Sequence, residues 1–238
     1  MADIKLCFFP HAGGSAMGYK NFKMFLDSSI VPVPIEPAGR GTRISEKPFT
    51  DILECVEDLF EHYNDIFTGG NTVFFGHSMG SLLAYELIRL MKKKNCTLPM
   101  HFFTSGRVSY PSLVPEKFTG LSKLNDEEFL SRFSESGGFP DMILKNKDLM
   151  AMLLPVLRAD VKMVDNYVVN LNDRAVDCDI TVFFGKNDTM YDGKDLDSWK
   201  TLTTKTCDIY GFNGNHFYFS DPAVKKEVCS VINRIIVK

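Results

Sequence analysis

The chain has 238 residues, of which 45% are apolar and 24% charged, with a formal net charge of -3. This balance is typical of a globular chain that buries its own core without metal or disulfide staples, and it excludes a disordered chain. The slight negative charge does not indicate a nucleic-acid-binding protein, which usually carries a strongly basic face. Six scattered cysteines form no C-x-x-C pair, which argues against a zinc site and against a disulfide framework.

The start of the chain carries no basic region followed by an apolar signal segment. No apolar stretch approaches the length that spans a membrane, and no coiled-coil pattern is present. We therefore expect a cytoplasmic protein that does not enter a membrane, with a monomer as the default state.

Strand-like runs alternate with longer helical patterns along the chain. The predicted strands are Ile4–Phe9, Ile30–Ile35, Thr72–Phe75, Met100–Thr104, Ile180–Phe184 and Thr206–Tyr210. The predicted helices are Asp51–Phe67, Ser78–Lys94, Leu149–Leu171 and Asp221–Ile236. This alternation predicts one α/β domain over residues 1–238, with a mainly parallel sheet flanked by helices.

The segment from about residue 108 to residue 163 breaks the alternation, because it contains short helical patterns and no strand-like run. An insertion of this kind between strands is typical of a helical lid over a site. The methionines of this segment would give a lid an adaptable apolar lining, and they would equally fill an ordinary core. The alternative is a pair of ordinary crossover helices.

The sequence Gly76-His77-Ser78-Met79-Gly80 is a G-x-S-x-G motif between the buried strand TVFF and the helical segment SLLAYELIRLM. This strand–turn–helix context is that of a nucleophile elbow, where a serine occupies a strained turn and glycines let the strand and helix approach. The start of the helix directs its amides toward negative charge that develops beside the serine. The motif therefore predicts Ser78 as a covalent nucleophile on an α/β-hydrolase fold.

A serine nucleophile requires a base, and His216 lies in the glycine- and asparagine-rich loop after the last predicted strand. In the α/β-hydrolase fold the catalytic residues follow the chain order Ser…Asp…His, and the histidine base lies in the loop after the last strand. His62 and His101 fall within predicted elements and are interpreted as structural, and the elbow should turn His77 away from the Ser78 hydroxyl.

The acid that orients this base should follow a strand between the serine and the histidine. Asp188 follows the strand ITVFF, and Asp192 four residues later is the alternative. Asp177 and Asp179 precede that strand and would lie at the wrong end of the sheet.

The segment Phe9-Pro10-His11-Ala12-Gly13-Gly14 follows the first predicted strand. A glycine-rich loop in this position brings a main-chain N–H close to a substrate carbonyl, so we predict an oxyanion hole made by the amides of Ala12 and Met79. His11 is interpreted as bracing the loop. The spacing does not match the dinucleotide-binding motif G-x-G-x-x-G.

Several stretches together resemble the type II thioesterases that accompany non-ribosomal peptide and polyketide synthetases. They are FPHAGGSA, EPAGRGTRISE, FFGHSMGSLLAYEL, FLSRFSESGGFP, LPVLRADVKMVDNY and GNHFYF. The family usually has Asp-Pro where this chain has Asp188-Thr189, and often Gly-Asp-His where it has Gly214-Asn215-His216.

This resemblance implies hydrolysis of acyl thioesters held on the phosphopantetheine arm of an acyl or peptidyl carrier protein domain, for editing or release, with no cofactor. It also suggests that Arg40, Arg43 or Arg158 meets the carrier or the phosphate of the arm. The alternative for these arginines is structural: Arg40 and Arg43 brace their loop, and Arg158 pairs with Asp160 or Asp165.

Three other functions remain open at this point. A carboxylesterase uses the same triad on oxygen esters, because the fold does not determine the substrate. An acyltransferase would not need an acid at the position of Asp188, and a non-catalytic carrier-binding protein would lack a triad member. The sequence does not indicate the acyl group or the synthetase.

Overall fold

The computed structural model describes residues 3–109, 114–135, 147–170, 172, 174–191 and 193–237. Its strands are β1 (Ile4–Phe9), β2 (Ile30–Pro34), β3 (Thr72–His77), β4 (His101–Ser105), β5 (Ile180–Gly185) and β6 (Cys207–Phe212). Its α-helices are α1 (Ile52–His62), α2 (Asn64–Phe67), α3 (Met79–Lys93), α4 (Asp126–Ser134), α6 (Lys147–Asn166) and α7 (Pro222–Ile236). Short 3₁₀ helices are η1 (Ala16–Met24), η2 (Gly41–Arg43), η4 (Glu116–Phe118), η5 (Leu121–Lys123), η6 (Gly193–Leu202) and η7 (Tyr218–Ser220).

The six strands form one parallel sheet in the order β2-β1-β3-β4-β5-β6. The predicted α/β-hydrolase architecture and all six predicted strands are confirmed, with no end shifted by more than two residues. The strand order reverses between β1 and β3, so the chain leaves the carboxyl ends of these neighbours in different directions. Open parallel sheets bind ligands in the crevice at such a point.

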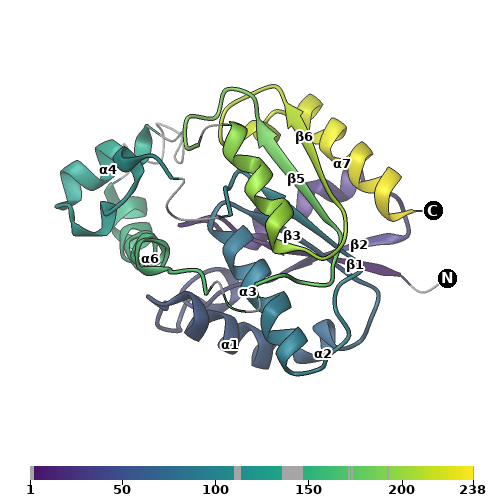
Figure 1. Ribbon diagram of the computed structural model, residues 1–238. Helices are drawn as coiled ribbons and strands as arrows, with labels where there is room; N and C mark the ends of the chain where they lie inside the picture. The colour runs from purple at the N-terminus through teal and green to yellow at the C-terminus, as the bar shows by residue number, and fades with distance from the viewer. Residues whose placement is uncertain are drawn as a thin grey trace.

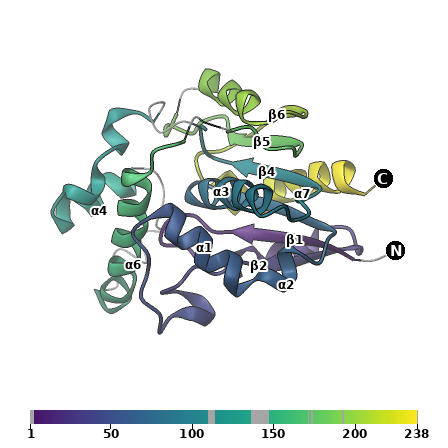
Figure 2. The same ribbon diagram turned by 60° about the horizontal axis from the view of Figure 1, so that its bottom comes forward.

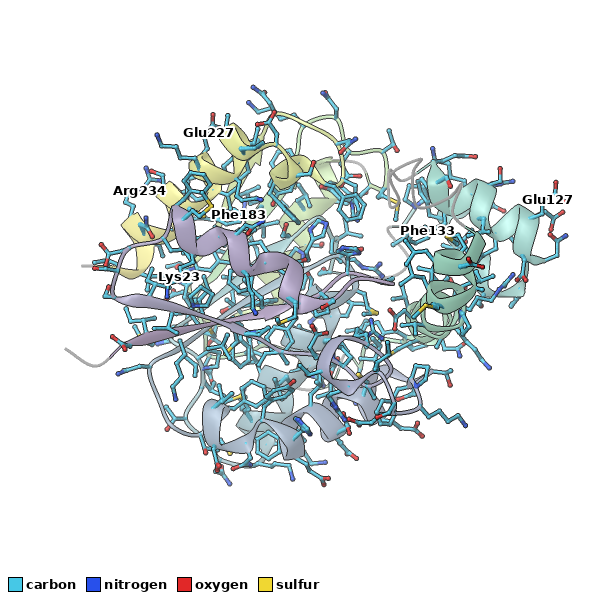
Figure 3. All side chains as sticks on the ribbon, turned by 180° about the vertical axis from the view of Figure 1, so that it is seen from behind. Lys23, Glu127, Phe133, Phe183, Glu227 and Arg234 are labelled. Carbon is cyan, nitrogen blue, oxygen red and sulfur yellow. The ribbon has the colours of Figure 1, made fainter. Side chains whose placement is uncertain are left out.

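Side chains of alternate residues in β1 enter the two cores on opposite faces of the sheet, as the period of two in a strand requires. Cys7 and Phe9 pack in the cluster that contains residues of α1 and α3, whereas Leu6 and Phe8 pack with residues of η1 and α7. Figure 1 shows the helices arranged around the sheet, and Figure 3, from behind, shows η1 and α7 across one face. Both faces are therefore buried, which explains the continuous apolar runs of the central strands.

The helix boundaries follow from local capping. Asp51 accepts hydrogen bonds from the amides of Leu53 and Glu54 at the start of α1, and Asp221 does the same for α7, which has Pro222 at its first position. The predicted helix Asp51–Phe67 is divided at Tyr63 into α1 and α2. The helices η1 and η6 were not predicted, because short 3₁₀ turns lack the apolar period of a longer helix.

The described parts of the segment between β4 and β5 form η4, η5, α4 and α6. Figures 1 and 2 show α4 and α6 together at one end of the sheet, away from both chain termini. We call these four elements the capping helices. The pair Gly137-Gly138, which at the level of the sequence suggests that such a lid opens, lies outside the described residues. Within the described ranges, no helix combines the length and apolarity needed to cross a membrane.

Candidate active site

Ser78 occupies the turn between β3 and α3, with a φ of 53° and a ψ of -115°. A non-glycine residue with positive φ in such a region is strained, and the surrounding structure must hold it there. Its amide donates a 2.8 Å hydrogen bond to the carbonyl of Ser105, and its carbonyl accepts a 3.0 Å bond from the amide of Ser81. The predicted elbow is therefore present, with Ser78 only partly buried.

The glycines of the elbow are required by close backbone contacts. A Cβ atom at Gly76 would lie 2.3 Å from the carbonyl oxygen of Gly80, and one at Gly80 would lie 2.1 Å from that of Phe9. Neither distance is compatible with a side chain. The G-x-S-x-G spacing therefore lets α3 start directly against β1 and β3, which brings the β1 loop beside Ser78.

Asp188 and His216 lie in the loops that follow β5 and β6. The Nδ1 of His216 is 2.7 Å from Oδ2 of Asp188, and Oδ1 of Asp188 accepts a 2.8 Å bond from the amide of Met190. Both side chains are almost fully buried. The amide of Asn187 donates a 2.9 Å bond to the carbonyl of Gly214 and so ties the two loops together.

In this pairing the Nδ1–H group of His216 donates a hydrogen bond to the carboxylate of Asp188. The other ring nitrogen, Nε2, is then free to accept a proton. Among the described residues no hydrogen bond joins Ser78 to His216. The structure therefore shows the hydrogen bond between the candidate acid and base but none between the base and the serine. Such bonds often tighten only when substrate is bound. Asp192, the alternative acid, lies outside the described residues.

Ala12 and Met79 line a cavity together with Ser78, which we call the Ser78 cavity. Within the described chain neither of their amides donates a hydrogen bond to a protein acceptor. The loop that carries Ala12 is fixed at the next residue, because the amide of Gly13 donates a 2.7 Å bond to Oδ2 of Asp160 in α6. These positions fit two donors for an oxyanion beside Ser78.

Three imidazole rings cluster behind the nucleophile. The ring of His77 lies 4.8 Å from that of His216 and 6.1 Å from that of His11, measured between centroids. Burial, followed by the charges of His216 and His11, keeps the pKa of His77 well below its usual range, and burial lowers the pKa of His11 to about 4. Both rings are therefore neutral at neutral pH.

Among the described residues, the polar contact of the His77 ring is with the side chain of Ser105 and not with Ser78. The Nδ1 of His77 lies 2.9 Å from Oγ of Ser105, which in turn lies 2.6 Å from the hydroxyl of Tyr218. Sequence reasoning missed this network, and its one signal was the aromatic run after His216. In the described parts of the chain no group of three or more His, Cys, Asp or Glu side chains is placed to hold a metal ion.

The three arginines considered at the sequence level all form ion pairs. Arg40 makes two 2.6 Å bonds to Asp160, and Arg43 bonds to Asp58 and Glu46. Arg158 bonds to Asp126 and to the carbonyl of Leu124. The pairing of Arg158 with Asp160 or Asp165 is wrong. Spacing along one helix indicates only partners on that helix, whereas the partners of Arg158 come from another segment.

The carboxylates that were expected to pair with Arg158 have other partners. Asp160 binds Arg40 and the amide of Gly13, whereas Asp165 accepts bonds from the amides of Gly120 and Ser122. Asp160 is fully buried. The hydrogen bond that it accepts from the amide of Gly13 links α6 to the loop of the predicted oxyanion hole.

The Ser78 cavity lies between the sheet and the capping helices. Its apolar lining includes Val114, Phe118, Leu121, Phe133, Val161 and Met190. Figure 3 shows Phe133 on the side of α4 that faces the sheet and Glu127 at the outer side. Arg107 also lines the cavity and was missed by sequence reasoning, although it follows the strand beside β3.

Comparisons with known proteins identify the family of this chain. A thioesterase domain model matches residues 4–236. The gramicidin S biosynthesis protein GrsT of Aneurinibacillus migulanus is 32% identical over 91% of this chain and 83% of its own length. The medium-chain S-acyl fatty acid synthase thioesterase of Rattus norvegicus is 30% identical over 93% of this chain and 83% of its own.

The structure of ClbQ from the colibactin NRPS/PKS pathway superposes with a TM-score of 0.89 and 30% identity, covering 99% of this chain and 97% of ClbQ. The resemblance to thioesterases of peptide and polyketide synthetase pathways is therefore confirmed. The chain belongs to the thioesterase family, and it is an enzyme that hydrolyses thioester bonds on an α/β-hydrolase fold.

Proposed function

We propose that this enzyme hydrolyses acyl thioesters carried on the phosphopantetheine arm of an acyl or peptidyl carrier protein domain of a synthetase, using Ser78, His216 and Asp188. The observation that carries the proposal is the partly exposed elbow serine in an apolar cavity, with a buried Asp188–His216 pair behind it. The names of GrsT and ClbQ support a role in secondary-metabolite biosynthesis.

In the first half of the reaction, Nε2 of His216 takes the proton of the Ser78 hydroxyl while Oγ attacks the thioester carbonyl carbon. The amides of Ala12 and Met79 bind the resulting oxyanion. The carbon–sulfur bond then breaks, and His216 gives its proton to the leaving thiol. Asp188 holds the imidazole tautomer and stabilises the imidazolium.

In the second half, His216 takes a proton from water, and the hydroxide attacks the ester carbonyl of acyl-Ser78. Collapse of the second oxyanion breaks the bond to Oγ, and His216 returns the proton to Ser78. The free carboxylic acid leaves. Each step uses groups of this chain and water, so the proposal requires no cofactor.

The capping segment, about residues 108–163 of the single domain, acts in this proposal as a lid that excludes water from the cavity and admits the arm. Of the three arginines, Arg158 is the proposed carrier contact, because its side chain is partly exposed. The burial of Arg40 and Arg43 argues for a bracing role instead. We place the enzyme in the cytoplasm as a monomer.

The test compares hydrolysis of an acetyl-loaded carrier protein with that of p-nitrophenyl acetate by the wild type, Ser78→Ala and Ser29→Ala. Ser29 lies at the opposite end of the sheet, before β2, and serves as the matched control. We expect high kcat/KM on the carrier, little on the ester, and a loss of roughly 10⁴-fold or more only in Ser78→Ala. Serine-dependent turnover of the ester alone would instead identify a carboxylesterase.

A further inference from the structure

Within the part of the chain that the structure describes, Arg107 is a buried arginine without a carboxylate partner. The chain has three arginines with similar burial: Arg40 and Arg107 are each 6% exposed and Arg43 is 3% exposed. Arg40 and Arg43 form ion pairs with buried or half-buried carboxylates. Among the described residues, the guanidinium of Arg107 forms no ion pair, and its buried Nε has no hydrogen-bond partner. An unpaired buried cation is costly and rare, so it requires an explanation.

The position of Arg107 is fixed by its backbone. It follows β4 by two residues, and its carbonyl accepts a 2.8 Å hydrogen bond from the indole of Trp199, a fully buried side chain. Gly106, with a φ of 61°, makes the turn that precedes it. The arginine is therefore held beside the elbow by a rigid part of the sheet.

The side chain borders the space in which the acyl group of a substrate would lie. Arg107 lines the Ser78 cavity and also a smaller pocket that contains Ser78, Gly106 and Met190. Most other residues of the Ser78 cavity are apolar. A charged donor in such surroundings interacts strongly with any acceptor that enters, because little water competes for it.

The carboxylate of Asp165 does not pair with this cation. Asp165 lines the same cavity, but its carboxylate accepts hydrogen bonds of 3.0 and 2.8 Å from the amides of Gly120 and Ser122 and makes no ion pair with Arg107. Burial lowers the pKa of Arg107 to about 10, with Tyr167 and Asp165 acting in the opposite direction. Arg107 is therefore charged at neutral pH.

We propose that Arg107 determines substrate specificity by binding a hydrogen-bond-accepting oxygen on the acyl chain, and that a carboxylate is the acceptor it prefers. A guanidinium binds carboxylates through two parallel N–H···O bonds, which makes it selective for that group. The preferred substrates would then be acyl groups with a second oxygen function rather than plain alkyl chains. This inference rests on the proposed thioesterase function of the same site.

The test uses pairs of N-acetylcysteamine thioesters that differ only in one group. Malonyl is paired with isovaleryl and succinyl with 4-methylpentanoyl, because an isopropyl group has the shape of a carboxylate without its charge. The measured quantity is the ratio of kcat/KM for the carboxylate to that for its alkyl partner. We expect a wild-type ratio above one for at least one pair, and a fall of roughly tenfold or more in Arg107→Met, since a hydrogen bond to a charged group has about that effect.

Two variants control for structural effects. Arg107→Lys retains the charge and should give an intermediate ratio. Arg43→Met removes an equally buried arginine that is paired outside the cavity. It should lower the melting temperature without changing the ratio. Arg107→Met should not lower the melting temperature, because it removes an unpaired buried charge. A wild-type ratio of one or below in both pairs, or a ratio that stays unchanged in Arg107→Met, would overturn the proposal.

A binding measurement separates this proposal from the proposed function. In the Ser78→Ala background, succinate should raise the melting temperature more than 4-methylpentanoate does, and Arg107→Met should abolish the difference. That result without thioester turnover would retain the anion subsite and reject the thioesterase substrate. Turnover of both thioesters with equal binding of the two acids would reject the subsite alone.

Discussion

The six-stranded body is stabilised by a core of fully buried aromatic rings, whereas the capping helices share a much smaller apolar cluster. The rings of the body include Phe8, Phe9, Phe74, Phe75, Phe102 and Phe103. In the described part of the capping segment the cluster consists of Leu121, Phe129, Leu157 and Val161. Regions with few buried contacts open at a lower free energy than the core. In the proposed function the body therefore holds the reacting groups, and the capping helices admit and select the acyl group.

One ion pair connects the two regions. Asp160 in α6 binds Arg40, which precedes η2, and accepts a bond from the amide of Gly13. The loop that carries Ala12 is thus attached both to β1 and to a capping helix. We infer that the position of this loop, which carries the proposed oxyanion donor Ala12 and is called the oxyanion loop below, depends on where α6 lies.

The largest effect is expected from the acid in the body. Asp188→Asn should lower kcat by about 10⁴-fold with little change in folding, because an amide cannot hold the productive imidazole tautomer. The matched variant Asp192→Asn should retain activity. Steady-state kinetics of both on one acyl thioester provide the measurement. A larger loss in Asp192→Asn would assign the acid to Asp192.

The difference in packing predicts unequal costs for two phenylalanines. Phe75→Ala in the body should lower the free energy of unfolding by about 3–5 kcal/mol, because it leaves a cavity among tightly packed rings. Phe133→Ala in α4 should cost about 1 kcal/mol and increase the relative rate on longer acyl chains. Denaturant titrations and a series of acyl lengths measure both. Equal destabilisation by the two variants would contradict the comparison.

The ion pair between the regions should matter for both stability and rate. Asp160→Asn should cost about 3 kcal/mol, because it leaves the buried guanidinium of Arg40 without a balancing charge. It should also lower kcat more than it changes KM, since the oxyanion loop loses the carboxylate that fixes it. Asp126→Asn breaks the exposed pair with Arg158 and serves as the control, with an expected cost of at most about 1 kcal/mol. Similar costs for the two variants would argue against the buried link.

The effect that we expect to be smallest at neutral pH is a pH dependence of stability in the body. Burial lowers the pKa of His101 to about 4, and its Nε2 lies 2.8 Å from Oγ1 of Thr181. Between pH 6.5 and about 4 the unfolded chain binds a proton at this position that the folded chain does not. Stability therefore falls as the pH is lowered through this range. His101→Gln should reduce that slope by about 1.4 kcal/mol per pH unit in denaturant titrations. An unchanged slope would contradict the assignment.

Much of the body could be predicted from the sequence. Strands buried on both faces are continuous apolar runs, and the elbow requires small residues at fixed offsets, so β3, β5 and Ser78 each have a local signal. The order of Ser78, Asp188 and His216 along the chain then located the candidate acid and base.

The missed features depend on contacts between distant segments. Arg40 meets Asp160 across 120 positions, and Arg158 meets Asp126 across 32, so local spacing could not predict either pair. The unpaired state of Arg107 is a property of the folded surroundings. The capping segment is predicted from the absence of strand-like runs, and its internal arrangement has no comparable sequence signal.

Reaction with a fluorophosphonate followed by mass spectrometry tests directly whether the body supplies Ser78 as the nucleophile. We predict one adduct, located on Ser78, in the wild type and in Ser29→Ala, and none in Ser78→Ala. Its formation should slow strongly in His216→Ala, since the base activates the hydroxyl. An adduct on another residue, or equal labelling of Ser78→Ala, would contradict the claim.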